Sequence, residues 1–401
     1  MADNKDKKVL NVPHLRFPEF SGEWEKCKLG DIATGFDYGM NAAAKPFDGE
    51  NKYIRITDID EASSTYIDKD IVSPDGTLTE NYLVNDRDIL LARTGASTGK
   101  SYLYRKSDEK LYYAGFLIRA NVTKHNPYFV FSQLHTHRYW SWVSIMSARS
   151  GQPGINSQEY SSFPVYVTSL REEEKISALL SLIDERIATQ NKIIGDLKLL
   201  KSAIIEEHYK KTEKQIVSVA DLGQPFNVGN LSKEDLSETG HLCIIYGELF
   251  TTYGATINVV ESHTHKFHGM TLSRKGDLLF PSSTTVDAVS LIAPSVINVD
   301  GVVLGGDMFG IHISSNFNPQ YLSYFFNLIA RNQLAKYAKG STIIHLHYKE
   351  IEKAKLLLPS LEEQNRMATC MAAFDERITI ENTIQKSLMI QKQYLLRQMF
   401  I

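Results

Sequence analysis

The sequence predicts an α+β protein in which two mixed α/β domains are joined by two long, antiparallel, coiled-coil-like helices. The two halves are an internal duplication, for which a pseudo-twofold arrangement is expected. One observation is a helix entrance that occurs twice, Ser-Leu-Arg-Glu at 169–172 and Ser-Leu-Glu-Glu at 360–363, each followed by Asp-Glu-Arg-Ile, at 184–187 and 375–378. Both pairs are separated by 191 residues. A second observation is that the first half is rich in Tyr, Phe, Ile and Thr with frequent Gly, Asp and Asn, which is typical of short strands joined by turns.

The length of the chain bounds its organisation. At 401 residues, two or three domains can each bury their own core. A repeat of this period indicates a duplicated half rather than a solenoid, because solenoids are built from several short units. The expected boundaries are a leader at 1–22, a first domain at 23–168, a first long helix at 169–213, a second domain at 214–359 and a second long helix at 360–401.

The first domain opens with Leu-Gly-Asp-Ile at 29–32, and two strand candidates follow. Residues 53–59 alternate in polarity as a half-buried strand does, and 88–92 form a short apolar run. The second domain repeats this order at 219–222, 243–246 and 277–280.

Each domain then carries a helix that begins with Asn-Pro, at Asn126 and at Asn318. An Asn side chain caps exposed N–H groups, and Pro suits the first helical position. Because the two starts are 192 residues apart, they belong to the duplication.

The two long helices are expected at roughly 172–209 and 362–400, and each would exceed about 50 Å at about 1.5 Å per residue. Each entrance reads as a capping box, in which a Ser caps the helix and a Glu three residues later returns a bond to the N–H of that Ser. Apolar residues spaced by three and four form a seam, interrupted by polar residues such as Gln190 and Lys201. The alternative is an ordinary amphipathic helix on each domain, but the length favours the coiled coil. The seam consists of Ile176, Leu180, Ile183, Ile187, Ile194, Leu197 and Ile204 in the first helix, and Met367, Met371, Phe374, Ile378, Leu388 and Leu395 in the second.

The composition is that of a soluble globular protein. Three widely separated cysteines favour a reducing compartment over a disulfide framework. No apolar run approaches the roughly 20 residues of a membrane span, and the first residues lack the apolar region of a signal peptide, so a cytoplasmic location is expected. The net charge is −3, so any nucleic-acid contact must use a local basic surface.

The segment at 95–101, Gly-Ala-Ser-Thr-Gly-Lys-Ser, is similar to a phosphate-binding P-loop but is one residue short. A P-loop opens into a helix, whereas 101–106 read as a strand, so nucleotide binding is not expected. This loop carries Arg93, Lys100, Arg105 and Lys106 with no acidic residue among them. It is either a basic patch for phosphate or base contact or simply a solvated loop.

Other motifs carry no expected catalysis or metal. The Asn-Pro-Tyr-Phe at 126–129 is similar to the tetrad of amino-methyltransferases, but it lacks the second Pro, and a helix start explains it. The histidines of 263–268 have no neighbouring cysteine and favour a surface loop over a zinc site. Alternation at 343–348 places His345 and His347 on one strand face, which is either a base-reading face or an exposed strand.

The duplicated order of these segments, with the leader at 13–24 and the opening at 29–32, resembles the specificity subunit of type I restriction–modification systems. The resemblance covers nearly the full length. The second half departs from it at its opening, which has no counterpart of Trp24, and at 281–284, where Pro-Ser-Ser-Thr stands in place of the Ala-Arg-Thr-Gly at 92–95.

The resemblance implies a non-catalytic chain with two target recognition domains, each reading one half of a bipartite, asymmetric DNA site. It implies that the helices space the domains and bind two methyltransferase (modification) subunits, which carry S-adenosylmethionine and methylate adenine. Two restriction subunits, which use ATP and Mg²⁺ for translocation and cleavage, complete the assembly, and no cofactor is expected on this chain. Two alternatives remain, a duplicated scaffold that does not bind DNA and a stand-alone DNA methyltransferase.

Under this resemblance, base-reading side chains are expected on loops and exposed strand faces, because Arg can bind guanine and Asn or Gln can bind adenine. In the first domain they are Arg55, Thr57, Arg93, Thr94, Ser97, Thr98, Lys100, Gln152 and Asn156. In the second domain they are Tyr246, Glu248, Tyr253, Ser283, Thr284, Lys339, Ser341, Thr342, His345 and His347.

Overall fold

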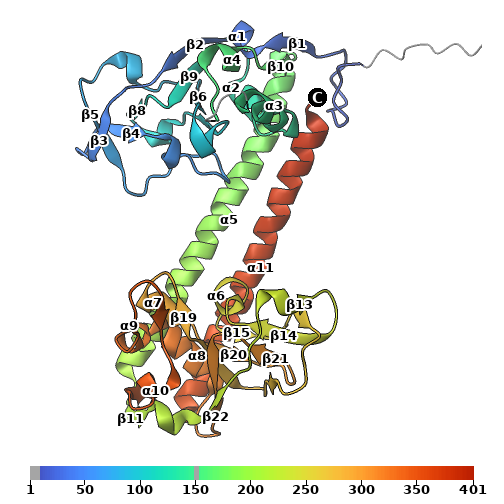
Figure 1. Cartoon of the computed structure of the whole chain (residues 1–401). Coiled ribbons are helices and arrows are strands. Elements are labelled where there is room, and N and C mark those ends of the chain that lie inside the picture. The colour runs from blue at the N-terminus through green and yellow to red at the C-terminus, as the bar shows by residue number, and fades with distance from the viewer. Residues whose placement is uncertain (1–9, 149–152) are drawn as a thin grey trace, which may run out of the picture. The chain divides into compact units, whose positions relative to one another are not determined.

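The computed structural model describes residues 10–148 and 153–401. They fall into two units, whose borders lie at equivalent points of the duplication. Unit 1 comprises the chain up to Asn191 together with Thr383–Ile401, and unit 2 is Lys192–Asn382. Each unit therefore holds one mixed domain, the first half of the long helix that follows it and the second half of the other long helix (Figure 1).

The first domain is built mainly of antiparallel strands. A four-stranded sheet has the order β2-β9-β6-β7, β4 pairs with β8 in parallel, β3 pairs with β5, and β1 pairs with β10. Its elements are β1 (Glu25–Lys28), α1 (Leu29–Ile32), β2 (Ala33–Tyr38), β3 (Ala43–Pro46), β4 (Lys52–Ile54), β5 (Val72–Asp75), β6 (Asp88–Ala92), β7 (Ser101–Leu103), β8 (Leu111–Tyr113), β9 (Leu117–Val122), α2 (Pro127–Gln133), α3 (His137–Ser147), α4 (Ser157–Ser161) and β10 (Pro164–Val167).

The second domain repeats this plan. Strands β12, β22 and β18 are neighbours like β2, β9 and β6, β14 pairs with β21 in parallel, and β11 pairs with β24. Its elements are β11 (Gln215–Ser218), β12 (Gly223–Asn227), β13 (Leu236–Ser237), β14 (His241–Ile245), α6 (Glu248–Thr251), β15 (Thr256–Ile257), β16 (His263–Thr264), β17 (Thr271–Leu272), β18 (Asp277–Pro281), β19 (Ser283–Thr284), α7 (Ala288–Leu291), β20 (Ser295–Ile297), β21 (Val303–Gly305), β22 (Met308–Ile313), α8 (Pro319–Leu328), α9 (Arg331–Ala335), β23 (Ile344–His345), α10 (Tyr348–Ile351) and β24 (Lys355–Leu358).

Both Asn-Pro helix starts are confirmed. The Asn126 side chain accepts hydrogen bonds from the N–H groups of Tyr128 and Phe129, and the Asn318 side chain accepts one from Tyr321. The backbone N–H of each capping Asn donates a hydrogen bond to a side chain in the first turn of the following long helix. Asn126 donates to Glu173 at 2.9 Å, and Asn318 donates to Gln364 at 3.0 Å.

The two long helices are α5 (Leu170–Lys211) and α11 (Leu361–Met399). The Ser169 hydroxyl accepts the Glu172 N–H at 3.4 Å, and Ser360 does the same for Glu363. The expected capping box is wrong in its second half, because both carboxylates bind other groups. Glu172 accepts hydrogen bonds from Arg16 and Thr168, and Glu363 pairs with His208 and Arg366.

The helices are antiparallel within each unit, and equivalent ion pairs join them. In unit 1 Asp184 of α5 pairs with Lys392 of α11, at 2.6 Å, and in unit 2 Asp375 of α11 pairs with Lys201 of α5. Both aspartates also accept a hydrogen bond from a tyrosine of their own domain, Tyr128 or Tyr324. The predicted duplication therefore extends to individual polar contacts.

Most predicted seam residues are buried, including Ile176 and Met371 at 1% and 0% exposure. Near the end of α5, Ile205 is fully buried and Ile204 only partly, so the apolar face is rotated by one residue from the predicted seam. In unit 1 the two helices share a core with the leader, formed by Trp24, Phe129, Ile176, Leu180, Ile183, Leu395, Leu396, Met399 and Phe400.

Two strand predictions are wrong in extent. The strand expected at 53–59 ends at Ile54, because the Asp58 carboxylate accepts the Arg55 N–H at 2.9 Å and closes a 3₁₀ turn at Ile56–Asp58. The alternating run at 343–348 forms only the short strand β23. The glycine loop at 95–101 leads into β7 and not into a helix, as expected for a segment that is no P-loop.

Candidate nucleic-acid interface

The first domain has a surface groove of about 680 Å³ into which three predicted base-reading residues bring their side chains, Arg55, Thr57 and Arg93. Its floor is lined by small residues such as Gly39 and Ala114. A Cβ on Gly39 would lie 2.3 Å from the Ala114 carbonyl oxygen, so the close approach of these two segments requires glycine.

Arg93 is anchored by its backbone and by one aromatic ring. Its backbone N–H donates to the Phe116 carbonyl at 3.0 Å, and its backbone carbonyl accepts the Ile155 N–H at 2.9 Å. Its guanidinium lies 4.8 Å from the centre of the Tyr38 ring, which favours a cation through the ring quadrupole. A hydrogen bond from Ser157, together with the charge of Arg93, lowers the pKa of Tyr38 from its usual value.

Arg55 differs from Arg93 in its charge balance. Its guanidinium makes two 2.8 Å hydrogen bonds to the Asp58 carboxylate, which raises the pKa of Arg55 above its usual value. Across the described part of the chain, no carboxylate is in ion-pair contact with Arg93, and its buried Nε has no hydrogen-bond partner. Among the described residues, the charge of Arg93 is therefore not neutralised by a carboxylate, whereas that of Arg55 is.

The remaining predicted residues of the first domain lie on or beside the loop after β6. Thr94 bridges to Gly154, which brings the loop next to Asn156. Several side chains are used within the domain. The Thr98 hydroxyl donates to the Gly95 carbonyl, and the Asn156 side chain caps α4. The Lys100 ammonium lies 3.5 Å from the carboxylate of Glu61, so the basic patch has an acidic neighbour from another part of the chain. Ser97 is half-buried on the same loop, and Gln152 lies outside the described residues.

In the second domain, several predicted residues gather around the pair of strands β19 and β23. Ser283 pairs with His345, and Lys339 bridges to His345 from the other side. The rings of His345 and His347 are stacked with centres 6.0 Å apart, although only His345 lies on a strand. Tyr246 lines a nearby cavity of about 740 Å³ with Asp307, whose carboxylate is 4.0 Å from His345.

The other five predicted residues of the second domain are bound within the domain, line a separate cavity or lie on the loop before β23. Both Glu248 oxygens are bound within the domain, by the Ile245 N–H and the Ser262 hydroxyl. The half-buried Tyr253 and Thr284 line a separate cavity, and the Tyr253 hydroxyl accepts the Glu261 N–H. Ser341 and Thr342 are exposed on the loop before β23.

The structure adds residues that the sequence did not suggest. Tyr38, Asn41 and Phe116 line the groove around Arg93, and the exposed fractions of Tyr38 and Phe116 are 41% and 56%. Tyr38 lies 55 positions before Arg93, so no local pattern could have joined them. The signal available in the sequence was an aromatic residue next to a glycine, as in Tyr38-Gly39 and Gly115-Phe116.

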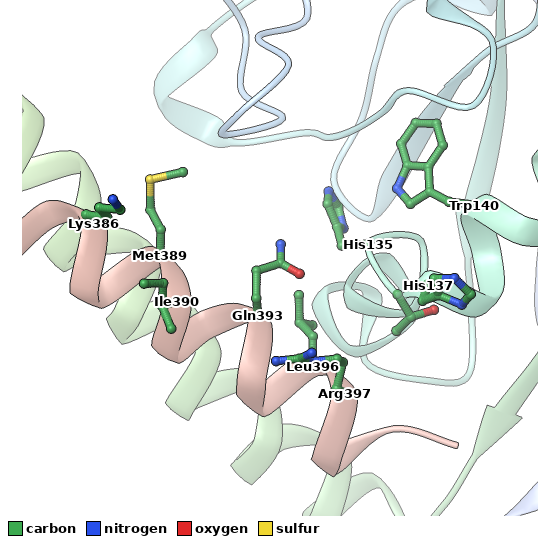
Figure 2. A pocket seen from close by; sticks show the side chains of 10 residues that line it. His135, His137, Trp140, Lys386, Met389, Ile390, Gln393, Leu396 and Arg397 are labelled. Atoms are coloured by element: carbon green, nitrogen blue, oxygen red, sulfur yellow. The ribbon is translucent and has the colours of Figure 1, made fainter. Parts of the chain in front are cut away.

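A second kind of surface lies on the long helices. In unit 1 a groove of about 690 Å³ separates the start of α3 from the second half of α11, as Figure 2 shows, with Trp140 and His137 opposite Met389, Ile390 and Arg397. Its lining is mostly apolar and contains no carboxylate. Burial lowers the pKa of His135 to about 4, so its ring is neutral at pH 7.

Apolar side chains exposed on the helices recur at the period of the duplication. Ile193 and Leu199 of unit 2 are 37% and 71% exposed. The equivalent residues of unit 1, Ile384 and Ile390, are 40% and 60% exposed. Each unit therefore presents the same apolar pair on its own part of the helices.

Within residues 10–148 and 153–401, no group of three His, Cys, Asp or Glu side chains is placed to hold a metal ion. None of the helices in that part of the chain is long and apolar enough to cross a membrane.

Two domains with one plan and different polar surfaces, set on duplicated helices, define a class of protein with two recognition units. The family model of the type I restriction modification DNA specificity domain matches the chain twice, at residues 21–199 and 211–389. The chain belongs to this family, and it is the specificity component of a restriction–modification system rather than a catalytic one.

Relatives and solved structures agree with this assignment. The chain is 21% identical to the type I restriction enzyme MjaVIII specificity subunit of Methanocaldococcus jannaschii, over 94% of this chain and 91% of that subunit. It shares its fold with the S subunit of a type I restriction–modification system from M. genitalium, at a TM-score of 0.61 and 13% identity, over 97% and 99% of the two chains. A chain from a structural study of complex assembly in the type I R-M system aligns with a TM-score of 0.54 and 14% identity, over 94% and 97%.

Proposed function

We propose that this chain reads both halves of a bipartite, asymmetric DNA target and positions modification subunits for adenine methylation. One domain reads each half-site, and the helices set the gap between them. The chain itself carries no cofactor. S-adenosylmethionine is bound by two modification subunits, ATP and Mg²⁺ are used by two restriction subunits, and the assembly works in the cytoplasm.

One observation carries this proposal. The two domains repeat the same strand pairing and the same anchoring to the helices, while their exposed polar residues differ. Arginines and aromatic rings line the groove of the first domain, and histidines, serines and a lysine gather on the second. A duplicated framework with unlike surfaces is suited to reading two different sequences along one DNA molecule.

The two partner sites are supported by the apolar pairs on the helices. Because Ile193 and Leu199 recur as Ile384 and Ile390, a partner that fits one pair also fits the other. Two copies of one modification subunit would thus be bound in equivalent ways. Burying such side chains at an interface contributes roughly 1.5–3 kcal/mol each.

Charged substitutions at these sites are expected to remove modification subunits one at a time. Leu199→Glu and Ile390→Glu should each leave a complex with one modification subunit, and the double variant should bind none, because a carboxylate cannot be buried there without a partner. The mass of the complex measures this. Leu182→Glu is the matched control, because Leu182 is 58% exposed on α5 but its equivalent in the duplication is Ala373. Loss of both subunits from one substitution, or an equal effect at Leu182, would contradict the two-site proposal.

The test of the function is long-read detection of methylated adenine in DNA from cells that express this chain with its modification subunit. The same cells without the chain are the control. A bipartite asymmetric motif that depends on the chain supports the proposal and gives the target and gap together. No chain-dependent motif, with both proteins expressed and associated, would overturn it.

A further inference from the structure

We propose that Arg93 reads a guanine in the half-site recognised by the first domain, by donating two hydrogen bonds to the O6 and N7 atoms of that base. This inference rests on the proposed DNA-reading function. It goes beyond that function because it names one base, one side chain and the pair of atoms that are recognised.

The first step is that the Arg93 guanidinium is preorganised. The backbone N–H of Arg93 donates to Phe116 and its backbone carbonyl accepts from Ile155, while the Tyr38 ring lies 4.8 Å from the guanidinium and supports its face. A side chain held in this way loses less rotamer entropy on binding than a mobile surface arginine. Its position is therefore fixed before DNA arrives.

The second step is that no carboxylate among the described residues neutralises the charge of Arg93. Nε is buried without a partner, and among the described residues no carboxylate forms an ion pair with Arg93. Arg55 lines the same groove but has a structural role, because its guanidinium donates two hydrogen bonds to the Asp58 carboxylate. Of the two arginines that line this groove, Arg93 is therefore the one whose charge is left for a ligand with paired acceptors.

The third step is the chemistry of that ligand. The edge of guanine in the major groove offers two adjacent acceptors, O6 and N7, which match the planar fork of a guanidinium. A phosphate offers a similar pair of oxygens, so the alternative is a contact to the DNA backbone. Tyr38 and Phe116 place exposed rings on the groove beside Arg93, and they favour the base, because base edges are read by apolar contacts as well as by hydrogen bonds.

The experiment uses the complex of this chain with its modification subunits, after the target has been read from the methylated DNA. Each guanine of both half-sites is replaced in turn by 7-deazaguanine, which lacks the N7 acceptor, and the affinity for the duplex is measured. One guanine in one half-site is expected to lose affinity by about fivefold to over a hundredfold. With Arg93→Ala, the same replacement should cause no further loss. The wild-type scan needs no variant, so it is valid even if a variant fails to fold.

Methylation motifs give an independent readout. Arg93→Ala and Arg93→Lys should both relax the requirement for guanine at that one position and leave the other half-site unchanged. An unchanged second half-site also shows that the variant folds. Uniform loss of binding at all sequences, with Lys restoring it, would make Arg93 a phosphate contact and overturn the inference. So would a first half-site without guanine, or an affinity loss that persists in Arg93→Ala. If wild-type cells show no chain-dependent motif, the proposed function fails first, and this inference with it.

Discussion

Removal of one turn from the long helices is expected to shorten the gap between the two half-sites and to leave their sequences unchanged. Four residues of helix correspond to about 6 Å, and base pairs are stacked about 3.4 Å apart, so a change of one or two base pairs follows. The deletion can be made in α5 alone, at 188–191, or in both helices, at the equivalent positions 188–191 and 379–382. The double deletion keeps the ion pairs of Asp184 and Asp375, and neither deletion removes the exposed apolar pairs.

Long-read methylation motifs measure this result. Replacing the same four residues of α5 by alanine is the control, because it keeps the length and is expected to keep the gap. Altered half-sites at the original gap would refute the role of the helices as a spacer.

The second large effect is expected from Trp24→Ala, which should lower the stability of unit 1 by about 3–5 kcal/mol. Trp24 is 1% exposed, and its ring packs edge-on against Phe129 and Phe400, with centres 5.3 and 6.1 Å apart. Its removal leaves a cavity where the leader, α2 and the end of α11 meet.

Hydrogen exchange of the whole chain checks this prediction, because a single unfolding midpoint is not defined for a protein of two units. Faster exchange is expected in the core of unit 1, with unit 2 as the internal reference. Trp140→Ala is the matched control, because Trp140 belongs to the same unit but is 43% exposed, and its loss should have a much smaller effect. Equal protection in the two variants would show that Trp24 does not hold this core together.

The helical part of the fold could be predicted because its signals are local. An Asn followed by Pro fixes a helix start by its own hydrogen bonds, and both starts were found where Asn126 and Asn318 stand. The long helices are marked by apolar residues spaced by three and four, which matches the turn of an α-helix. The duplication itself strengthened each prediction, since the same signal had to appear twice.

The strands and polar contacts were harder to predict because they depend on distant partners. The run at 53–59 alternates like a strand, yet Asp58 turns the chain by binding Arg55, which a pattern of polarity cannot reveal. Glu172 looked like part of a capping box, but Arg16, 156 residues away, binds it instead. In the groove, the same limit applies to Tyr38 and Arg93, whose proximity depends on the sheet that joins β2 to β6 through β9. The predicted base-reading residues themselves remain predictions.

The division of the chain into its two units also bears on synthesis by the ribosome. Unit 2 is one continuous stretch, Lys192–Asn382, so its core residues are all synthesised before residues 383–401. The synthesis of unit 1 begins first, but its core needs Leu395, Leu396, Met399 and Phe400, which are made only after the whole of unit 2. Domains generally fold from the N-terminus onwards during synthesis. In this protein, the part that is translated first must be the part that finishes folding last.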